Sequence, residues 1–230
     1  HLLKFYLLRA AKLEIISIRA IIFYSYFCTL MTKTAQQLKA LISTPKKIVI
    51  TTHRGPDGDA MGSSLALCNF LEQLGHTVNV ITPNEYAKFL HWLPGNDAVI
   101  NYEENEEKAA AITAEADLIF LLDFSHLSRI ATFASAVSKS KATKIMIDHH
   151  QDPDTDIAEL IFSDTTACST AQLVYEVMEA MEMTTYLNKA IAECLYVGIM
   201  TDTGSFKYAS TTAKTHHVIA ELINAGAENA

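Results

Sequence analysis

The chain has 230 residues, of which 50% are hydrophobic, and a formal net charge of −8 at pH 7. This length and composition are enough for one α/β domain with a sizeable core. The excess of acids makes the chain a poor candidate for binding long duplex nucleic acid through the phosphate backbone. The longest uncharged run near the N-terminus, residues 20–31, is shorter than the roughly 20 residues of a membrane-spanning helix, so no membrane association is expected.

Apolar periodicity predicts that strands and helices alternate along the chain. In chain order we predict a helix at 34–42, a strand at 47–51, a helix at 60–74, a strand at 77–81, a helix at 103–115, a strand at 117–122, a short helix at 133–139, a strand at 144–147, an edge strand at 157–162, and helices at 170–181, 187–197 and 211–224. The strand at 117–122 is apolar on both faces, as a central parallel strand requires. This order predicts a doubly wound, mostly parallel sheet with helices on both faces.

Acids and imidazoles follow three of the predicted strands. The first strand is followed by His53, Asp57 and Asp59, the strand at 117–122 by Asp123, and the strand at 144–147 by Asp148, His149 and His150. Asp202 lies in a Gly- and Thr-rich segment, interpreted as a loop after a helix that ends near Val197. In open α/β sheets ligands bind at the carboxyl edge of the strands. These donors suit divalent cations such as Mn2+, and two ions about 3.5–4 Å apart form a hydrolytic site.

Two of these residues also have a structural interpretation. Asp59 stands where an N-cap for the helix at 60–74 belongs, so capping and ligation are compatible there. Asp123 ends an apolar strand, where a charge is costly unless it is paired. A metal pair would compensate it, and so would hydrogen bonds within the following loop.

Several polar residues near these segments are candidate substrate contacts. Thr203 and Ser205 offer hydroxyls to phosphate oxygens, and Arg129 follows Asp123 closely enough to contact phosphate. The pair Ser169–Thr170 opens a predicted helix, whose N-terminus would either receive a phosphate or simply be capped.

Four segments together resemble the motifs of the DHH phosphoesterase family. They are Thr52-His-Arg-Gly-Pro-Asp-Gly-Asp-Ala-Met-Gly62, Asp123, Asp148-His-His150 and Gly198-Ile-Met-Thr-Asp-Thr-Gly-Ser-Phe206. The likeness spans roughly residues 45–225 and looks closest to the nanoRNase branch, whose members are bifunctional oligoribonucleases that also dephosphorylate 3′-phosphoadenosine 5′-phosphate.

The resemblance implies a site that holds two Mn2+ ions, with Mg2+ or Co2+ as alternatives. His53, Asp57 and Asp123 would hold the first ion. The second would be held by Asp59, Asp123, His149 and Asp202, so that Asp123 bridges. The catalytic group facing the phosphoryl group would be His150. Asp148 would orient a ligand ring without contacting an ion itself.

The resemblance also implies an activity, which is two-metal hydrolysis of short oligoribonucleotides and of 3′-phosphoadenosine 5′-phosphate. Hydrolysis of inorganic pyrophosphate or of a cyclic dinucleotide on the same site is one alternative, and a non-catalytic nucleotide-binding module is another. Four cysteines without a C-x-x-C pair indicate reduced thiols in a cytoplasmic protein. A homodimer is one of the oligomeric states left open.

The resemblance further implies how the chain is organised. We interpret residues 1–30 as an upstream or non-native extension, because Met31-Thr-Lys-Thr resembles an ordinary start. Residues 31–230 would form the catalytic domain. Nothing after residue 225 matches the Gly-rich, His-containing substrate domain of the family, so that domain is expected to be absent from a truncated chain.

Overall fold

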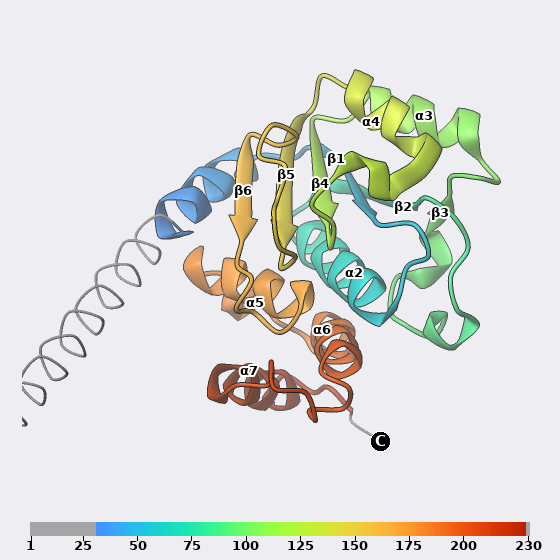
Figure 1. Ribbon diagram of the computed structural model, residues 1–230. Helices are drawn as coiled ribbons and strands as arrows, with labels where there is room; N and C mark the ends of the chain where they lie inside the picture. Colours follow the sequence, from blue (N-terminus) through green and yellow to red (C-terminus); the bar gives the residue numbers. More distant parts are fainter. Residues whose placement is uncertain (1–30, 229–230) are drawn as a thin grey trace, which may run out of the picture.

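The computed structural model describes residues 31–228, so the expectation about residues 1–30 lies outside the described residues. Within that range no helix combines the length and the apolar character that crossing a membrane requires. The chain is helical over 31–41 and then alternates between strands and helices (Figure 1). The helices are α2 (Gly58–Gln73), α3 (Glu106–Ala114), α4 (Ala134–Lys139), α5 (Thr170–Ala180), α6 (Lys189–Asp202) and α7 (Ala213–Asn224).

Six parallel strands form one sheet in the order β3-β2-β1-β4-β5-β6. Their bounds are β1 (Lys47–Thr52), β2 (Thr77–Thr82), β3 (Ile100–Asn101), β4 (Leu118–Leu122), β5 (Thr143–Asp148) and β6 (Leu160–Ser163). The strand order reverses between β1 and β4, which is the place where doubly wound sheets bind ligands.

Successive residues of the central strands pack into two separate cores, because side chains alternate across a sheet. Ile50 and Phe120 lie in the core shared with α2, α5 and α6, whereas Val49 and Ile119 lie in the core shared with α3 and α4. Helices therefore cover both faces of the sheet, with α6 and α7 forming a further layer outside α2 and α5 (Figure 1). The predicted doubly wound parallel sheet is confirmed.

Two local expectations differ from the structure. The two-residue edge strand β3 was not anticipated, because so short a segment carries no periodicity. More importantly, α6 does not end near Val197 but continues to Asp202. The Gly- and Thr-rich segment was interpreted as a loop, yet Gly198 lies inside the helix, where the absence of a side chain allows close packing against α2.

Candidate metal centre

The register of the central strands brings three of the polar segments to one edge. Thr52 pairs with Leu122, so His53 and Asp123 leave the sheet side by side. The backbone N–H of Asp123 donates to the carbonyl of Ile147 at 3.1 Å, which places Asp123 next to the end of β5. Asp123 has φ 64°, a conformation that bulky residues rarely adopt and that is often found at functional sites.

A first group of side chains gathers around one oxygen of Asp123. His53 Nε2 lies 3.4 Å from Asp123 Oδ2 and 3.9 Å from Asp57 Oδ2. One ligand atom from each of these three residues lies within 4.8 Å of the others, close enough for a single cation. The three residues are those expected to hold the first ion.

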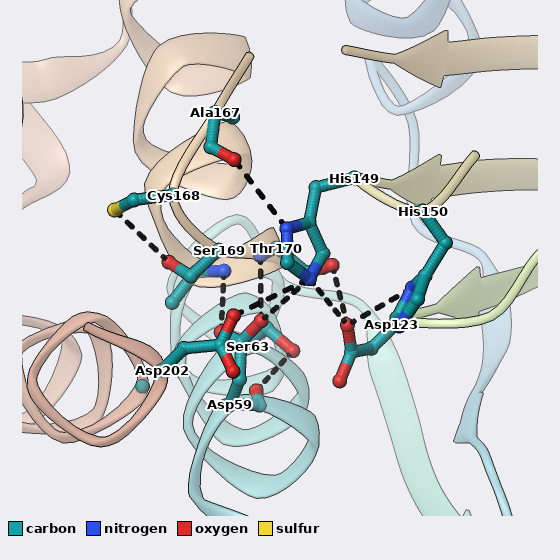
Figure 2. Close-up of polar contacts among 12 residues, drawn as sticks. Asp59, Ser63, Asp123, His149, His150, Ala167, Cys168, Ser169, Thr170 and Asp202 are labelled. Atoms are coloured by element: carbon teal, nitrogen blue, oxygen red, sulfur yellow. Dashed lines mark hydrogen bonds and ion pairs between the residues drawn. The ribbon is translucent and has the colours of Figure 1, made fainter. Parts of the chain in front are cut away.

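A second group lies around His149 (Figure 2). Its Nε2 atom is 3.4 Å from Asp202 Oδ2, 3.9 Å from Asp59 Oδ2 and 3.6 Å from Asp123 Oδ1. Ligand atoms of Asp59, His149 and Asp202 also lie within 4.8 Å of one another. The two groups meet at Asp123, which contacts a histidine of each through a different oxygen.

Backbone carbonyls orient both histidines. His53 Nδ1 lies 3.0 Å from the carbonyl of Arg54, and His149 Nδ1 lies 3.4 Å from the carbonyl of Ala167. A proton on Nδ1 would satisfy each carbonyl, and Nε2, which faces the carboxylates, would be the atom that binds a metal ion.

The N-terminus of α5 fixes the two buried carboxylates. The backbone N–H groups of Thr170 and Ala171 donate to the two oxygens of Asp59 at 2.6 and 2.8 Å, while the Thr170 hydroxyl donates to Asp123 Oδ1 at 2.8 Å (Figure 2). Ser169 caps the helix through Gln172. This helix end therefore receives a carboxylate of the chain itself rather than a phosphate.

Sequence reasoning missed the role of Thr170 as a link between Asp59 and Asp123. The available signal was its place in the first turn of a predicted helix, but nothing local shows which distant acid that turn meets. Asp59 and Thr170 are 111 residues apart in the chain.

Glycines allow α2 and α6 to approach closely enough to bring Asp59 and Asp202 together. A Cβ on Gly62 would lie 2.5 Å from the carbonyl oxygen of Cys194 and 2.8 Å from the nitrogen of Gly198. A Cβ on Gly198 would lie 2.9 Å from Asp59 Oδ1. Real Cβ atoms do not come so close, so neither position accepts a side chain without movement of the helices.

Asp202 and Asp59 reach the centre in ways that differ from our expectation. Asp202 is the last residue of α6 rather than part of a loop. The N-cap of α2 is Asp57, whose Oδ1 accepts the N–H groups of Asp59 and Ala60 at 3.0 Å, so Asp59 lies inside the first turn and does not cap it.

His150 is oriented by Asp148. Its Nδ1 lies 2.7 Å from Asp148 Oδ1 and 3.8 Å from Asp123 Oδ1, and its side chain is 41% exposed. The hydrogen bond to Asp148 raises the pKa of His150, which favours its cationic form. Asp148 is fully buried, and its Oδ2 has no hydrogen-bond partner among the described residues.

The acids of the centre lack an ordinary counter-charge. Burial, and then the charges of Asp123 and Asp202, raise the pKa of Asp59 well above its usual value. Burial also raises the pKa of Asp202. Burial would raise the pKa of Asp123 as well, but the hydrogen bond with His53 and the charge of His149 outweigh it and the pKa falls.

Within residues 31–228, histidines are the only ion-pair partners of these acids, and neither lysine nor arginine reaches them. Clustered buried carboxylates without a fixed cation are costly, and divalent ions offset that cost. The donor set, made of imidazole nitrogens and carboxylate oxygens, therefore fits two such ions.

Of the three residues expected to contact substrate, one is buried and two are exposed. Thr203 is fully buried, and its hydroxyl donates to Ile199 and accepts from the N–H of Phe206, so it is not available to a substrate in this conformation. Ser205 is exposed, and Arg129 is exposed on the wall of a pocket that His150 also lines.

Comparison with known proteins agrees with this geometry. The DHH family, N-terminal domain, matches residues 47–199. The bifunctional oligoribonuclease and PAP phosphatase NrnA of Bacillus subtilis is 32% identical over 81% of this chain and 56% of its own length. The cyclic-di-AMP phosphodiesterase GdpP of the same organism is 26% identical over 83% of this chain and 30% of its own length.

A solved structure also matches closely. The crystal structure of an exopolyphosphatase-related protein from Bacteroides fragilis has a TM-score of 0.83 and 39% identity, covering 85% of this chain and 57% of that one. The chain thus spans about half the length of NrnA and of this protein. With the family match over 47–199 and the sequence likeness to NrnA, the chain belongs to the DHH family.

Proposed function

We propose that this chain carries the catalytic centre of a metal-dependent phosphoesterase that hydrolyses short oligoribonucleotides and 3′-phosphoadenosine 5′-phosphate. The observation that carries the proposal is a pair of three-residue ligand groups, each with its ligand atoms within 4.8 Å, in which Asp123 of the first group lies 3.6 Å from His149 of the second. The likeness to NrnA supports this choice of substrates. A short nucleotide also suits a chain with a net charge of −8, because long nucleic acid is bound through many cationic contacts to its phosphates.

Two divalent ions would be held by the residues of the two groups. His53, Asp57 and Asp123 would hold one, and Asp59, Asp123, His149 and Asp202 the other. Ions held there would supply Lewis-acid stabilisation of the charge that develops on a phosphoryl oxygen. Mn2+ suits this mixed donor set, and Mg2+ or Co2+ are alternatives to be compared directly.

His150 and Asp148 supply the part of the chemistry that belongs to the chain itself. His150 Nδ1 donates to Asp148, so the other ring nitrogen remains available to a substrate. Because the pKa of His150 is raised, that nitrogen keeps its proton to a higher pH than in an ordinary histidine. His150 would therefore donate a hydrogen bond to the phosphoryl group or a proton to the leaving oxygen.

The direct test is hydrolysis of pApA and of 3′-phosphoadenosine 5′-phosphate by the full-length protein, with Mn2+, Mg2+ or Co2+ and after chelation. We expect metal-dependent release of AMP, and its loss in Asp123→Asn. The second candidate substrate is cyclic di-AMP, which the likeness to GdpP favours. Turnover of cyclic di-AMP far above that of pApA would replace the proposed substrate class, and binding of nucleotides without turnover would contradict catalysis.

A further inference from the structure

A pocket of about 370 Å³ adjoins the candidate metal centre and shares one wall with it. That shared wall is His150, whose Nδ1 is held by Asp148 on the side of the centre. The rest of the lining comes from the segment that follows β4, with Ser125, His126 and Arg129, and from the loop after β5, with Asp152. A volume of this size lies in the range of small-ligand sites.

Arg129 gives this pocket a guanidinium that is not already paired. Residues 31–228 contain two arginines, and Arg54 is paired with Glu103 at 3.1 Å. Arg129 takes part in no ion pair with a described residue, and it lines the same pocket as His150. An unpaired guanidinium is well suited to bidentate binding of a phosphate.

We propose that this pocket is a subsite for a second phosphate group, separated by one nucleoside from the phosphate that is hydrolysed. The inference rests on the proposed function and names a feature of its substrates. A 5′-phosphorylated dinucleotide and 3′-phosphoadenosine 5′-phosphate differ in many respects, but both carry two phosphate groups flanking one nucleoside. A cation placed beside the centre would recognise that shared feature.

The charge balance of the two positions supports this assignment. The reacting phosphate would meet divalent ions, whereas the second phosphate needs a cation from the chain, which has a net charge of −8. Arg129 supplies it. Asp152 lines the pocket with the opposite sign, without an ion pair to Arg129. Asp152 would therefore weaken phosphate binding, and its neutralisation should strengthen it.

The test compares pApA with ApA, which lacks the 5′-phosphate, in the wild-type full-length protein and in three variants. Arg129→Gln removes the proposed contact. Arg54→Gln is the matched control. Arg54 is close by, since its backbone N–H donates to the Arg129 carbonyl at 2.7 Å, but its side chain is already paired with Glu103. Asp152→Asn removes the opposing charge. Thermal melting of each variant checks that the fold is retained.

We expect Arg129→Gln to lower kcat/KM for pApA by roughly 10- to 100-fold, the effect of losing a charge-assisted hydrogen bond, and to leave ApA almost unchanged. Asp152→Asn should raise kcat/KM for pApA alone, and Arg54→Gln should affect neither substrate. An equal loss for both dinucleotides in Arg129→Gln would overturn the subsite, since it would indicate a contact with the base or the sugar. An unchanged preference for pApA would overturn it as well.

This design separates the subsite from the proposed function. If the wild-type protein hydrolyses neither dinucleotide, the proposed function fails, and calorimetric binding of pApA and ApA then judges the subsite alone. A preference for pApA that Arg129→Gln abolishes would support the subsite. Binding of the two dinucleotides with equal affinity would overturn it.

Discussion

The buried and exposed acids of the centre are held in place by different means. The side chains of Asp59 and Asp123 are 1% and 3% exposed, and hydrogen bonds from the start of α5 fix both. Those of Asp57 and Asp202 are 59% and 30% exposed and stand at the ends of α2 and α6. The buried pair is thus positioned by the packing of the core, whereas the rim pair depends on where two helices begin and end.

The largest effect should come from the buried residue shared by both groups. Asp123→Asn keeps the size of the side chain but removes the charge between His53 and His149. Because both proposed ion positions use Asp123, we expect the loss of Mn2+ affinity to exceed the roughly 10- to 100-fold cost of removing a supporting residue. Calorimetric titration measures it. An Mn2+ affinity within threefold of the wild-type value would contradict the bridging position.

The next effect concerns the hydroxyl that holds Asp123 in place. Thr170→Val retains the β-branched shape and the backbone N–H groups on Asp59 but loses the hydrogen bond to Asp123 Oδ1. We expect Mn2+ affinity to fall by about 10- to 100-fold. Thr170→Ser keeps a hydroxyl and should restore most of the affinity. Equal binding by the valine and serine variants would show that the contact does not position the carboxylate.

A smaller effect should follow from widening the contact between α2 and α6. In an isolated helix Gly198→Ala would be stabilising by about 1 kcal/mol. Here the added Cβ meets Ala171 at 2.5 Å and Asp59 at 2.9 Å, so we expect a loss of about 1–3 kcal/mol in unfolding free energy and weaker Mn2+ binding.

Gly75→Ala provides the control for that comparison. Gly75 has φ +84° with open space around it, so the substitution adds backbone strain far from any side-chain contact. Urea unfolding should show a loss of stability in Gly75→Ala without any change in Mn2+ affinity. Unaltered stability and metal binding in Gly198→Ala would mean that the close approach of the helices is not needed.

The smallest effect should appear at the rim, in the protein without metal. Asp57→Ala removes the N-cap of α2, whereas Asp57→Asn keeps a side-chain oxygen for the N–H groups of Asp59 and Ala60. We expect the alanine variant to be less stable than the asparagine variant by about 0.5–2 kcal/mol in urea unfolding. Identical unfolding curves would show that capping by Asp57 contributes nothing.

The sequence indicated the buried part of the centre better than the rim. Strand ends are readable from apolar runs, and in a parallel sheet those ends meet at one edge, so His53, Asp123 and Asp148 were placed correctly for a stated physical reason. Asp202 was correctly grouped with them, but on the mistaken view that α6 ends near Val197.

The remaining features depend on contacts between distant segments. Glycine is common just after the end of a helix, and only the packed structure shows that Gly198 instead lies inside α6 and allows it to approach Asp59. The burial of Thr203 and the contact of Thr170 with two acids are likewise set by how the helices pack. Local propensity carries no information about such contacts.

The central claim is that two ions are divided between two groups that share Asp123. Its most direct test is the stoichiometry of Mn2+ binding, measured by calorimetry in the wild-type protein, Asp57→Asn and Asp202→Asn. We predict two ions per chain in the wild type and one in each variant, with the retained ion in a different group. A single ion in the wild type, or the loss of all binding in both variants, would contradict the account.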